Sequence, residues 1–526
     1  MTDGVQTSED PFALPIVQIE GNGDLARVCD QIESLLRERA VPIYQRGGML
    51  VRVINEGGEE RKGISRDKLS PRIVPFDDLS LAELVTRHIE VQRRNRKTGE
   101  FARIDCPRAI AQTLLARKEW EFPHLEAVVE HPIMLTTGEV LWESQYHEDS
   151  GLLLSVPLFT FISPENDPGR EAAMESLEGL RGLLDGFPFV DDTDLSVALA
   201  FILTAFVRPV LPTSPAFGVD AHAPGSGKST LIRVASRIAT GREPAFITFG
   251  EDPTELRKLL FAALLEGDQQ IAIDNVDVPV SGSELAVILT SPMYRGRVLG
   301  QSTNASVPTK AVISFNGNNL TIVGDLTRRV LVCRLDPMCE RPAEREFDFD
   351  PIEEIAQARS EFVLQALTIM QAYVLNGERV SIRPFGSFEE WSRLVREPLI
   401  WLGLPDPVDS IRVLEQFDPE RTQLRSMIEA VKAAQGLKPF KASDLIAMAT
   451  AKHQRQHQLM GEPAVEGEAQ EMLKEALILV CERNGELNVK ALGKWLLRMK
   501  GRIQSGFRFV QRQQSTVSIW CLDAAQ

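Results

Sequence analysis

The sequence has few cysteines, and none of them is spaced like a metal ligand pair. Six cysteines are scattered over 526 residues, with no C-x-x-C pair among them. This pattern argues against a zinc ribbon and against a disulfide framework. It fits the reducing cytoplasm, which is the location that we expect.

Long hydrophobic runs are also missing. The best one, residues 195–207, has 13 residues and ends at Arg208-Pro209. A bilayer span needs about 20 apolar residues, so this run predicts a buried helix and no membrane partner. Residues 1–10 are polar and acidic, the opposite of a signal peptide, and we expect them to be disordered.

Positive charge is scarce overall, because the formal net charge is −16. It is nevertheless concentrated in places. Residues 487–522 hold no acidic residue, and residues 93–97 form a second basic cluster. An acidic protein with local basic faces is expected to touch phosphate through chosen surfaces. The basic residues of the C-terminal stretch are Lys490, Lys494, Arg498, Lys500, Arg502, Arg508 and Arg512.

The most informative segment present is residues 222–230, His-Ala-Pro-Gly-Ser-Gly-Lys-Ser-Thr. It follows an apolar strand pattern and precedes a helical one, which is the layout of a phosphate-binding P-loop. His222 replaces the first glycine of that motif. We expect Lys228 to reach the β- and γ-phosphates of ATP and Ser229 to contact Mg²⁺. The nucleotide-binding residues predicted here are Pro224, Gly225, Ser226, Gly227, Lys228, Ser229 and Thr230.

A second apolar strand, residues 270–277, carries an acid where it ends. Asp274 is the predicted Walker B carboxylate, which would hold Mg²⁺ through water together with Ser229. Many such ATPases place an acid directly after this residue, but here that position is Asn275. The general base is therefore left open between Glu255 and Asp277.

Residues 309–320 form a third apolar strand, which ends in amides. Asn316 or Asn318 would bond the γ-phosphate or the attacking water without adding negative charge. Two adjacent arginines, Arg328 and Arg329, follow just before the next strand. We expect an arginine finger that enters the ATP site of a neighbouring subunit.

A P-loop, an acid-tipped strand, an Asn-tipped strand and an Arg pair, in this order, describe a ring ATPase of the AAA+ or superfamily-three helicase kind. With the flanking segments 186–192, 203–209 and 294–300, the region of about residues 100–410 resembles the helicase part of phage- and plasmid-borne primase-helicase proteins. The resemblance implies a hexameric, ATP-driven DNA translocase used to replicate a mobile element. No primase module is visible, so a separate primase or polymerase is an expected partner.

Two segments are predicted to contact DNA. Tyr294, Arg295 and Arg297 lie between the acid-tipped and Asn-tipped strands, where superfamily-three helicases carry a channel hairpin. They are expected to grip a single strand, with the tyrosine stacked on a base. The C-terminal pattern of helices followed by a β-hairpin is typical of a winged helix whose second helix, residues 489–500, contacts duplex DNA. In that helix Val489, Leu492, Leu496 and Met499 are expected to face inward, and the DNA contacts are expected from Lys490, Lys494, Arg498, Lys500 and Arg502.

The predicted fold class is α/β: a P-loop NTPase core with an N-terminal α+β domain and a C-terminal helical, winged-helix-like domain. The expected divisions are 1–10 disordered, 11–168 N-terminal domain, 169–212 helical collar, 213–347 ATPase core, 348–436 helical extension and 437–526 DNA-binding domain.

Three functions fit the motifs. The first is a DNA helicase. The second is a non-unwinding ATPase, an initiator or loader that binds DNA through its C-terminal domain and changes shape with nucleotide. The third is a P-loop scaffold or defence protein in which ATP only drives assembly. The predicted channel segment favours the first over the second.

Overall fold

The computed structural model describes most of the chain, in two units. The units are Met1–Leu320 with Arg328–Ser410, and Ile411–Gln526 with Thr321–Thr327. Residues 1–10, for which disorder was predicted, lie outside the described part. The described residues are 14–21, 23–55, 64–65, 70–156, 167–248, 253–298, 304–345, 347–412, 419–451, 465–483, 485–514 and 517–524.

The first unit is built on a six-stranded sheet of order β19-β13-β18-β15-β14-β4. The first five strands run parallel, and β4 pairs antiparallel at one edge. The central strands are buried along nearly their whole length, as expected for a parallel sheet covered on both faces. The mixed α/β architecture of the prediction is therefore confirmed. The strands are β4 (Ile64–Ser65), β13 (Ala216–Ala221), β14 (Ala245–Thr248), β15 (Gln270–Val276), β18 (Val312–Asn318) and β19 (Val330–Leu335).

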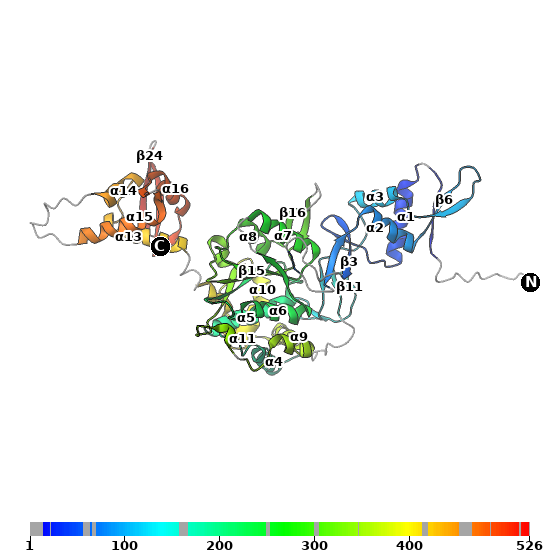
Figure 1. Ribbon diagram of the computed structural model, residues 1–526, viewed down its shortest axis with the longest axis horizontal. Helices are drawn as coiled ribbons and strands as arrows, with labels where there is room; N and C mark the ends of the chain where they lie inside the picture. The colour runs from blue at the N-terminus through cyan, green and yellow to red at the C-terminus, as the bar shows by residue number, and fades with distance from the viewer. Residues whose placement is uncertain are drawn as a thin grey trace, which may run out of the picture. The chain divides into compact units, whose positions relative to one another are not determined.

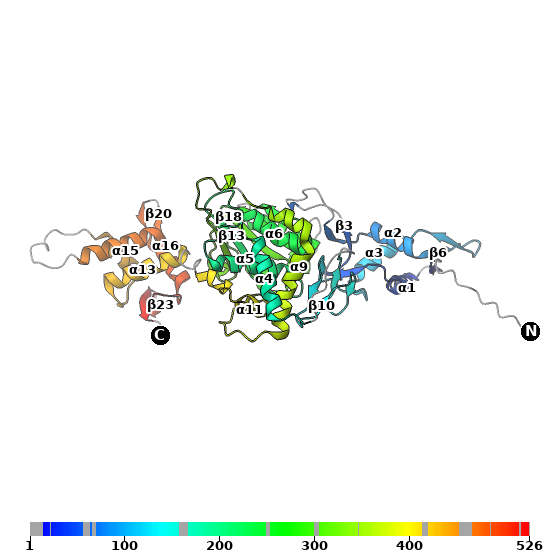
Figure 2. The same cartoon turned by 90° about the horizontal axis from the view of Figure 1, so that it is seen from below.

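Helices α4 (Arg170–Leu183), α5 (Asp192–Val207), α6 (Lys228–Thr240) and α9 (Pro351–Asn376) pack together beside this sheet (Figure 2). Helix α5 is the predicted buried helix, and all its residues from Ser196 to Val207 are buried. Its N-terminus is closed by a capping box at Asp191. Arg334 of β19 donates to Asp194 of α5 at 2.8 Å, which ties that helix to the sheet. Among the described residues, no helix is both long and apolar enough to cross a membrane.

Four further helices of the first unit lie between residues 253 and 401. They are α7 (Pro253–Glu266), α8 (Ser283–Thr290), α10 (Glu389–Trp391) and α11 (Glu397–Trp401). The antiparallel hairpin of β16 (Met293–Arg297) and β17 (Asn304–Pro308) packs against α7.

The N-terminal part of the first unit contains three helices and several short sheets (Figure 1). A hairpin turns at Gly47-Gly48 between two of its strands. Its helices are α1 (Leu25–Glu38), α2 (Asp78–His88) and α3 (Arg108–Arg117). Its strands are β1 (Ile16–Ile19), β2 (Tyr44–Arg46), β3 (Met49–Asn55), β5 (Pro71–Pro75), β6 (Glu90–Arg94), β7 (Phe101–Ile104), β8 (Ala127–Val129), β9 (Ile133–Met134), β10 (Val140–Leu141), β11 (Tyr146–His147) and β12 (Leu152–Leu154).

The second unit has its own core, which includes Trp520, Phe509 and Leu496. Phe440 forms an isolated antiparallel bridge with Trp520 of β24, which places a third chain segment beside the terminal hairpin. Helices followed by a hairpin are present, as the sequence predicted. Helix α13, which we had grouped with the extension 348–436, packs in this core. The elements are α13 (Pro419–Gln435), α14 (Ala442–Thr450), α15 (Val465–Cys481), β20 (Glu482–Arg483), β21 (Glu486–Leu487), α16 (Val489–Met499), β22 (Ile503–Gln504), β23 (Phe507–Gln514) and β24 (Val517–Ala524).

Candidate functional site

The loop between β13 and α6 has the backbone geometry of an anion cradle. Gly225 and Gly227 have φ values of 77° and 96°, in the left-handed region that glycine adopts without strain. Helix α6 begins at Lys228, directly after Gly227. The first N–H groups of a helix have no partner within the helix, so this end of α6 is suited to bind phosphate.

The polar residues predicted on different strands meet at one edge of the sheet. In the register, Ala221 at the end of β13 lies opposite Asn318 of β18, and Asp274 of β15 lies opposite Thr248 of β14. Strand β18 lies between the P-loop strand and the Asp274 strand, so an amide separates Lys228 from the carboxylate. A register shift in β15 between Ile273 and Val276 places Asp274 at an irregularity just before the last pair of the strand, Val276 with Gly317.

Lys228 is held by the residues that flank it. Its Nζ donates to Asn318 Oδ1 at 2.8 Å and to the Ala223 carbonyl at 3.0 Å. Burial lowers the pKa of Lys228, and the negative charges of Asp220 and Asp274 partly offset that shift. The ammonium group is thus placed between the Asn-tipped strand and the loop, and it faces two carboxylates.

Asn316 and Asn318 occupy different places, although they are only two residues apart. The side chain of Asn316 is buried; its Nδ2 donates to Ser229 Oγ at 3.0 Å, and its Oδ1 accepts from Asn275 N at 2.7 Å. Asn318 is exposed and contacts Lys228. Asn316 therefore joins the P-loop serine to the end of β15, whereas Asn318 is the amide that is open to a ligand.

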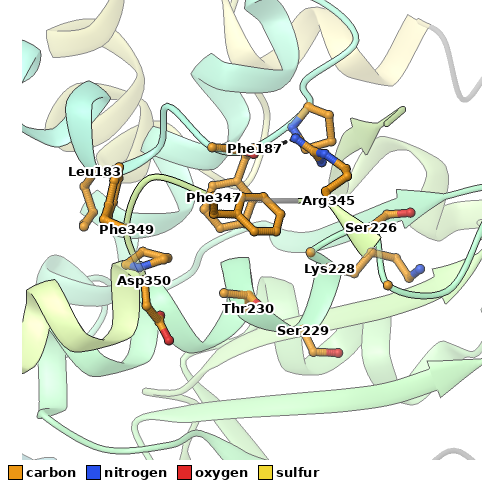
Figure 3. Close-up of a pocket in the computed structure, with 15 residues that line it drawn as sticks. Leu183, Phe187, Ser226, Lys228, Ser229, Thr230, Arg345, Phe347, Phe349 and Asp350 are labelled. Carbon is orange, nitrogen blue, oxygen red and sulfur yellow. Dashed lines mark hydrogen bonds between the residues drawn. The ribbon is translucent and has the colours of Figure 1, made fainter. Parts of the chain in front are cut away.

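A pocket of about 580 Å³ opens from the P-loop toward the segments before α5 and before α9 (Figure 3). In the close-up, Phe187, Phe347 and Phe349 lie toward the left and centre, with Lys228 and Ser229 to the right. Arg345 lies over the Phe347 ring at 4.9 Å, and its Nη2 donates to the Gly186 carbonyl at 3.1 Å. The pocket therefore has a polar end at the P-loop and an aromatic end whose size suits a nucleotide base. The other lining residues are Leu183, Gly186, Pro188, Gly225, Ser226, Gly227, Thr230, Asp350 and Pro351.

The aromatic end of this pocket was missed by the sequence analysis. Phe187 lies within the segment 186–192 that supported the family resemblance, but it was given no role there. Phe347 and Phe349 follow β19 about 160 residues later, and only the folded chain brings them to Phe187. A Cβ placed on Gly227 would lie 3.4 Å from the Phe187 ring, so this ring packs directly on the P-loop.

The two candidates for the general base remain distinct. Asp277 is exposed just beyond β15, at the same edge of the sheet as Asp274. Glu255 lies in the first turn of α7 and accepts from Lys258 Nζ at 2.7 Å. The alternatives predicted from the sequence therefore stay open, with Glu255 engaged in a local ion pair.

The two residues of the arginine pair differ in exposure. Arg329 is half-buried, and its Nη1 donates to the Ala286 carbonyl of α8 at 2.9 Å. Arg328, the last residue of a 3₁₀ turn (Gly324–Arg328), is exposed. Arg328 is therefore the better placed of the two to reach another subunit.

One predicted role in the β16–β17 hairpin is wrong. Tyr294 is 7% exposed, and its ring centroid lies 6.2 Å from that of Phe261 in α7. It packs inward and is not available to stack on a base. Arg295 and Arg297 alternate with it along β16 and are exposed, as a contact with phosphate requires.

The basic helix α16 is oriented largely as predicted. Leu492, Leu496 and Met499 are buried and Lys490, Lys494 and Arg498 are exposed, but Val489 is 45% exposed, which corrects its predicted inward position. Val489 is the first residue of the helix, where the chain has not yet reached the core.

Part of the positive charge near α16 is compensated inside its own unit. Arg498 and Arg502 both lie near Glu420 of α13, at 3.6 and 2.9 Å. Lys500 Nζ donates to Gln511 Oε1 at 3.2 Å. The sequence window that holds no acid therefore folds against an acid from an earlier helix, and Lys490 and Lys494 are exposed on α16.

The residues present fit a nucleotide with Mg²⁺. Ser229 Oγ accepts a hydrogen bond from Asn316 and keeps a lone pair for a metal, and Asp274 is half-buried at the same sheet edge. Carboxylate and hydroxyl oxygens are the ligands that Mg²⁺ prefers, with water completing its shell. Ser229 and Asp274 would therefore hold the ion against the phosphates.

Comparison with known proteins gives weak similarities only. No protein-family model matches the chain, and no curated protein matches it. The apo A form of the NrS-1 C-terminal region aligns with 94% of this chain and 98% of its own length, at 12% identity and a TM-score of 0.40. SCCmec type IV Cch, described as an active helicase, aligns over 92% and 97% at 12% identity and a TM-score of 0.34. The JCV helicase aligns over 44% and 66% at 12% identity and a TM-score of 0.21. Since these TM-scores lie below 0.5, the functional argument rests on the residues of this chain.

Proposed function

We propose that this protein is an ATP-driven DNA helicase that works as a ring, with six subunits as the expected number, in the replication of a mobile element. The observation that carries the proposal is the meeting of Lys228, Asn318 and the Asn316–Ser229 pair at the sheet edge that also holds Asp274. In the proposal, ATP binds with its phosphates on the P-loop and its base against the phenylalanines.

Each residue at this edge has a distinct task in the proposal. Bound Mg²⁺ would neutralise charge on the β- and γ-phosphates. Lys228 exchanges its contact with Asn318 for the phosphates, which frees the amide of Asn318 to orient water. Asn316 fixes the Ser229 hydroxyl, and Asp277 or Glu255 accepts the proton of the attacking water.

DNA contact is proposed at two surfaces. Arg295 and Arg297 would hold the backbone of a single strand in the ring channel, and Lys490 and Lys494 would bind duplex phosphates at the C-terminal unit. A separate primase or polymerase is the proposed partner in replication.

The direct test is strand displacement on a forked duplex, with and without ATP and Mg²⁺. The wild-type chain should release the labelled strand only with both, and Lys228→Ala should release none while keeping its fold by circular dichroism. ATP hydrolysis by Lys228→Ala at most of the wild-type rate would refute the nucleotide site.

The second candidate is a non-unwinding initiator or loader. It is favoured by the exposed basic face of α16, which lies outside the ATPase unit. DNA-stimulated hydrolysis without strand release, on forks of either polarity, would select this alternative.

A further inference from the structure

The β6–β7 hairpin carries positive charge to which the proposed helicase assigns no role. Residues 90–104 hold five basic and two acidic residues, a net charge of +3 in a chain of net charge −16. All five basic side chains are exposed. They are Arg93, Arg94, Arg96, Lys97 and Arg103.

The hairpin has a well-formed turn. Its strands pair antiparallel from Val91–Ile104 to Arg94–Phe101. Asn95 N donates to the Glu100 carbonyl at 2.7 Å, and Gly99 N donates to the Asn95 carbonyl at 2.8 Å. Basic side chains on such an element are presented in a fixed order, which lowers the entropy lost when they bind a ligand.

A hydrophobic body anchors the base of the hairpin. Val91 is 1% exposed and belongs to the core formed with α1, α2 and α3, and Ile104 packs against the same core. Strand β1 pairs with β6 along its whole length. Beyond this base, β6 and its turn extend away from the three helices (Figure 1). The element is therefore three-stranded up to Arg93, and a two-stranded basic tip, Arg94 to Phe101 with its turn, projects from this packed support.

One acid of the segment, Glu90, lies at the base of the hairpin, and a second, Glu100, lies at its turn. The Glu90 carboxylate accepts from Gln92 at 2.8 Å and lies 3.9 Å from Arg103. Arg103 is 60% exposed, and an exposed ion pair at that separation adds little stability. The hairpin therefore presents five exposed basic side chains and a net charge of +3 over residues 90–104.

We propose that the β6–β7 hairpin binds duplex DNA by placing its basic side chains against phosphates on both sides of a groove. A two-stranded β-ribbon fits the major groove, which is about 12 Å wide. Arginine and lysine supply phosphate contacts that hold register on a duplex. Binders of single strands combine charge with exposed aromatic rings, whereas the single aromatic residue of residues 90–104, Phe101, is half-buried. This site is separate from the nucleotide pocket and from the basic face of α16.

The test uses the full chain without nucleotide and a short fluorescent duplex, titrated over a series of salt concentrations. The triple variant Arg94→Gln, Arg96→Gln, Lys97→Gln should flatten the slope of log K against log salt by about 2 to 3, because three phosphate contacts are lost. The charge-keeping variant Arg94→Lys, Arg96→Lys should retain most of the slope. The same triple variant made in a Lys490→Gln, Lys494→Gln background should flatten the slope by the same further amount, because the two surfaces act independently.

A matched control removes the same charge from paired arginines on the nearby helices: Arg27→Gln, Arg37→Gln and Arg87→Gln, which contact Asp24, Glu121 and Glu83. If this control flattened the slope of log K against log salt equally, the effect would come from net charge, and the proposal would be overturned. If the triple variant lost more affinity for a single strand than for the duplex, the choice of duplex DNA as the partner would be overturned. Basal ATP hydrolysis by the triple variant, measured in parallel, should stay at the wild-type rate. If the wild-type chain itself hydrolysed no ATP, the helicase proposal would be refuted, but the measured DNA affinities would still decide the proposal for the hairpin.

Discussion

At the scale of single residues, the aromatic end of the nucleotide pocket gives a prediction that separates binding from chemistry. The Phe347 ring lines the aromatic end of the pocket, where the proposed function places the base, on the other side from Lys228. Phe347→Ala should raise KM for ATP by about 10-fold, because loss of a stacked ring costs roughly 1–1.5 kcal/mol. The kcat should change little, since Lys228 and Asn318 are untouched.

Steady-state hydrolysis kinetics measure both quantities. Phe347 is 55% exposed, so its truncation leaves the core intact. Met338→Ala, on an exposed side chain outside the pocket, serves as the control. An unchanged KM for ATP in Phe347→Ala would show that the base does not bind against this ring.

Lys310 predicts a pH dependence of stability. Burial, with a further contribution from Arg208, lowers its pKa from 10.5 to about 8. Between these two values the unfolded chain holds a proton that the folded chain has released, so stability should rise with pH there. Below about pH 8 the full cost of the buried charge is present.

Lys310→Met should therefore stabilise the protein at pH 7 by about 1–3 kcal/mol, and the gain should shrink as pH rises toward 10. The Leu211 carbonyl, which accepts from Lys310, keeps a bond from Arg208 at 2.8 Å. Urea unfolding at several pH values is the measurement. A destabilised variant, or a gain that grows with pH, would contradict the assignment.

At the scale of elements, motifs that lie within a short stretch of sequence were predictable. Contacts between stretches far apart in the sequence were not. The P-loop, Asp274 and the Asn-tipped strand were each predicted from a local sequence pattern, because glycine spacing and apolar strands are local properties. The order of the strands was not readable, so the separation of Asp274 from Lys228 by β18 came only from the structure. The pocket wall formed by Phe187 and Phe347 depends in the same way on chain segments far apart.

Tyr294 shows a different kind of error. Side chains alternate between the faces of a strand, so Tyr294 must point away from Arg295 and Arg297. The sequence already held this information, but grouping the three residues as one motif overlooked it. Gly296 lies on the inner face with Tyr294, and a Cβ there would meet the Phe261 ring at 2.3 Å.

This orientation predicts which changes in the hairpin affect DNA. Tyr294→Leu should leave single-strand affinity unchanged, whereas a stacked tyrosine would contribute about 1–3 kcal/mol. Arg295→Ala with Arg297→Ala should weaken single-strand binding and flatten its salt dependence. Fluorescence titration with a single strand separates the two, and a loss in Tyr294→Leu beyond its effect on folding would restore the stacking role.

At the scale of the whole molecule, the arginine pair predicts that hydrolysis depends on assembly. Arg328 is exposed at the end of its turn, whereas Arg329 is half-buried. We expect Arg328 to act on the nucleotide of a neighbouring subunit. Arg328→Ala should then lower kcat by about 10³-fold or more while leaving nucleotide binding in place.

Mixing two inactive chains tests this action between subunits. Arg328→Ala keeps a complete P-loop, and Lys228→Ala keeps a complete finger, so a mixed ring contains interfaces in which a working P-loop faces a working arginine. Hydrolysis should return in the mixture and pass through a maximum with the mixing ratio. Arg341→Ala, which breaks only an exposed pair with Glu344, is the control and should be active alone. If mixed rings form, as judged by co-purification of differently tagged chains, and no ratio restores activity, then Arg328 acts within its own subunit or has no catalytic part.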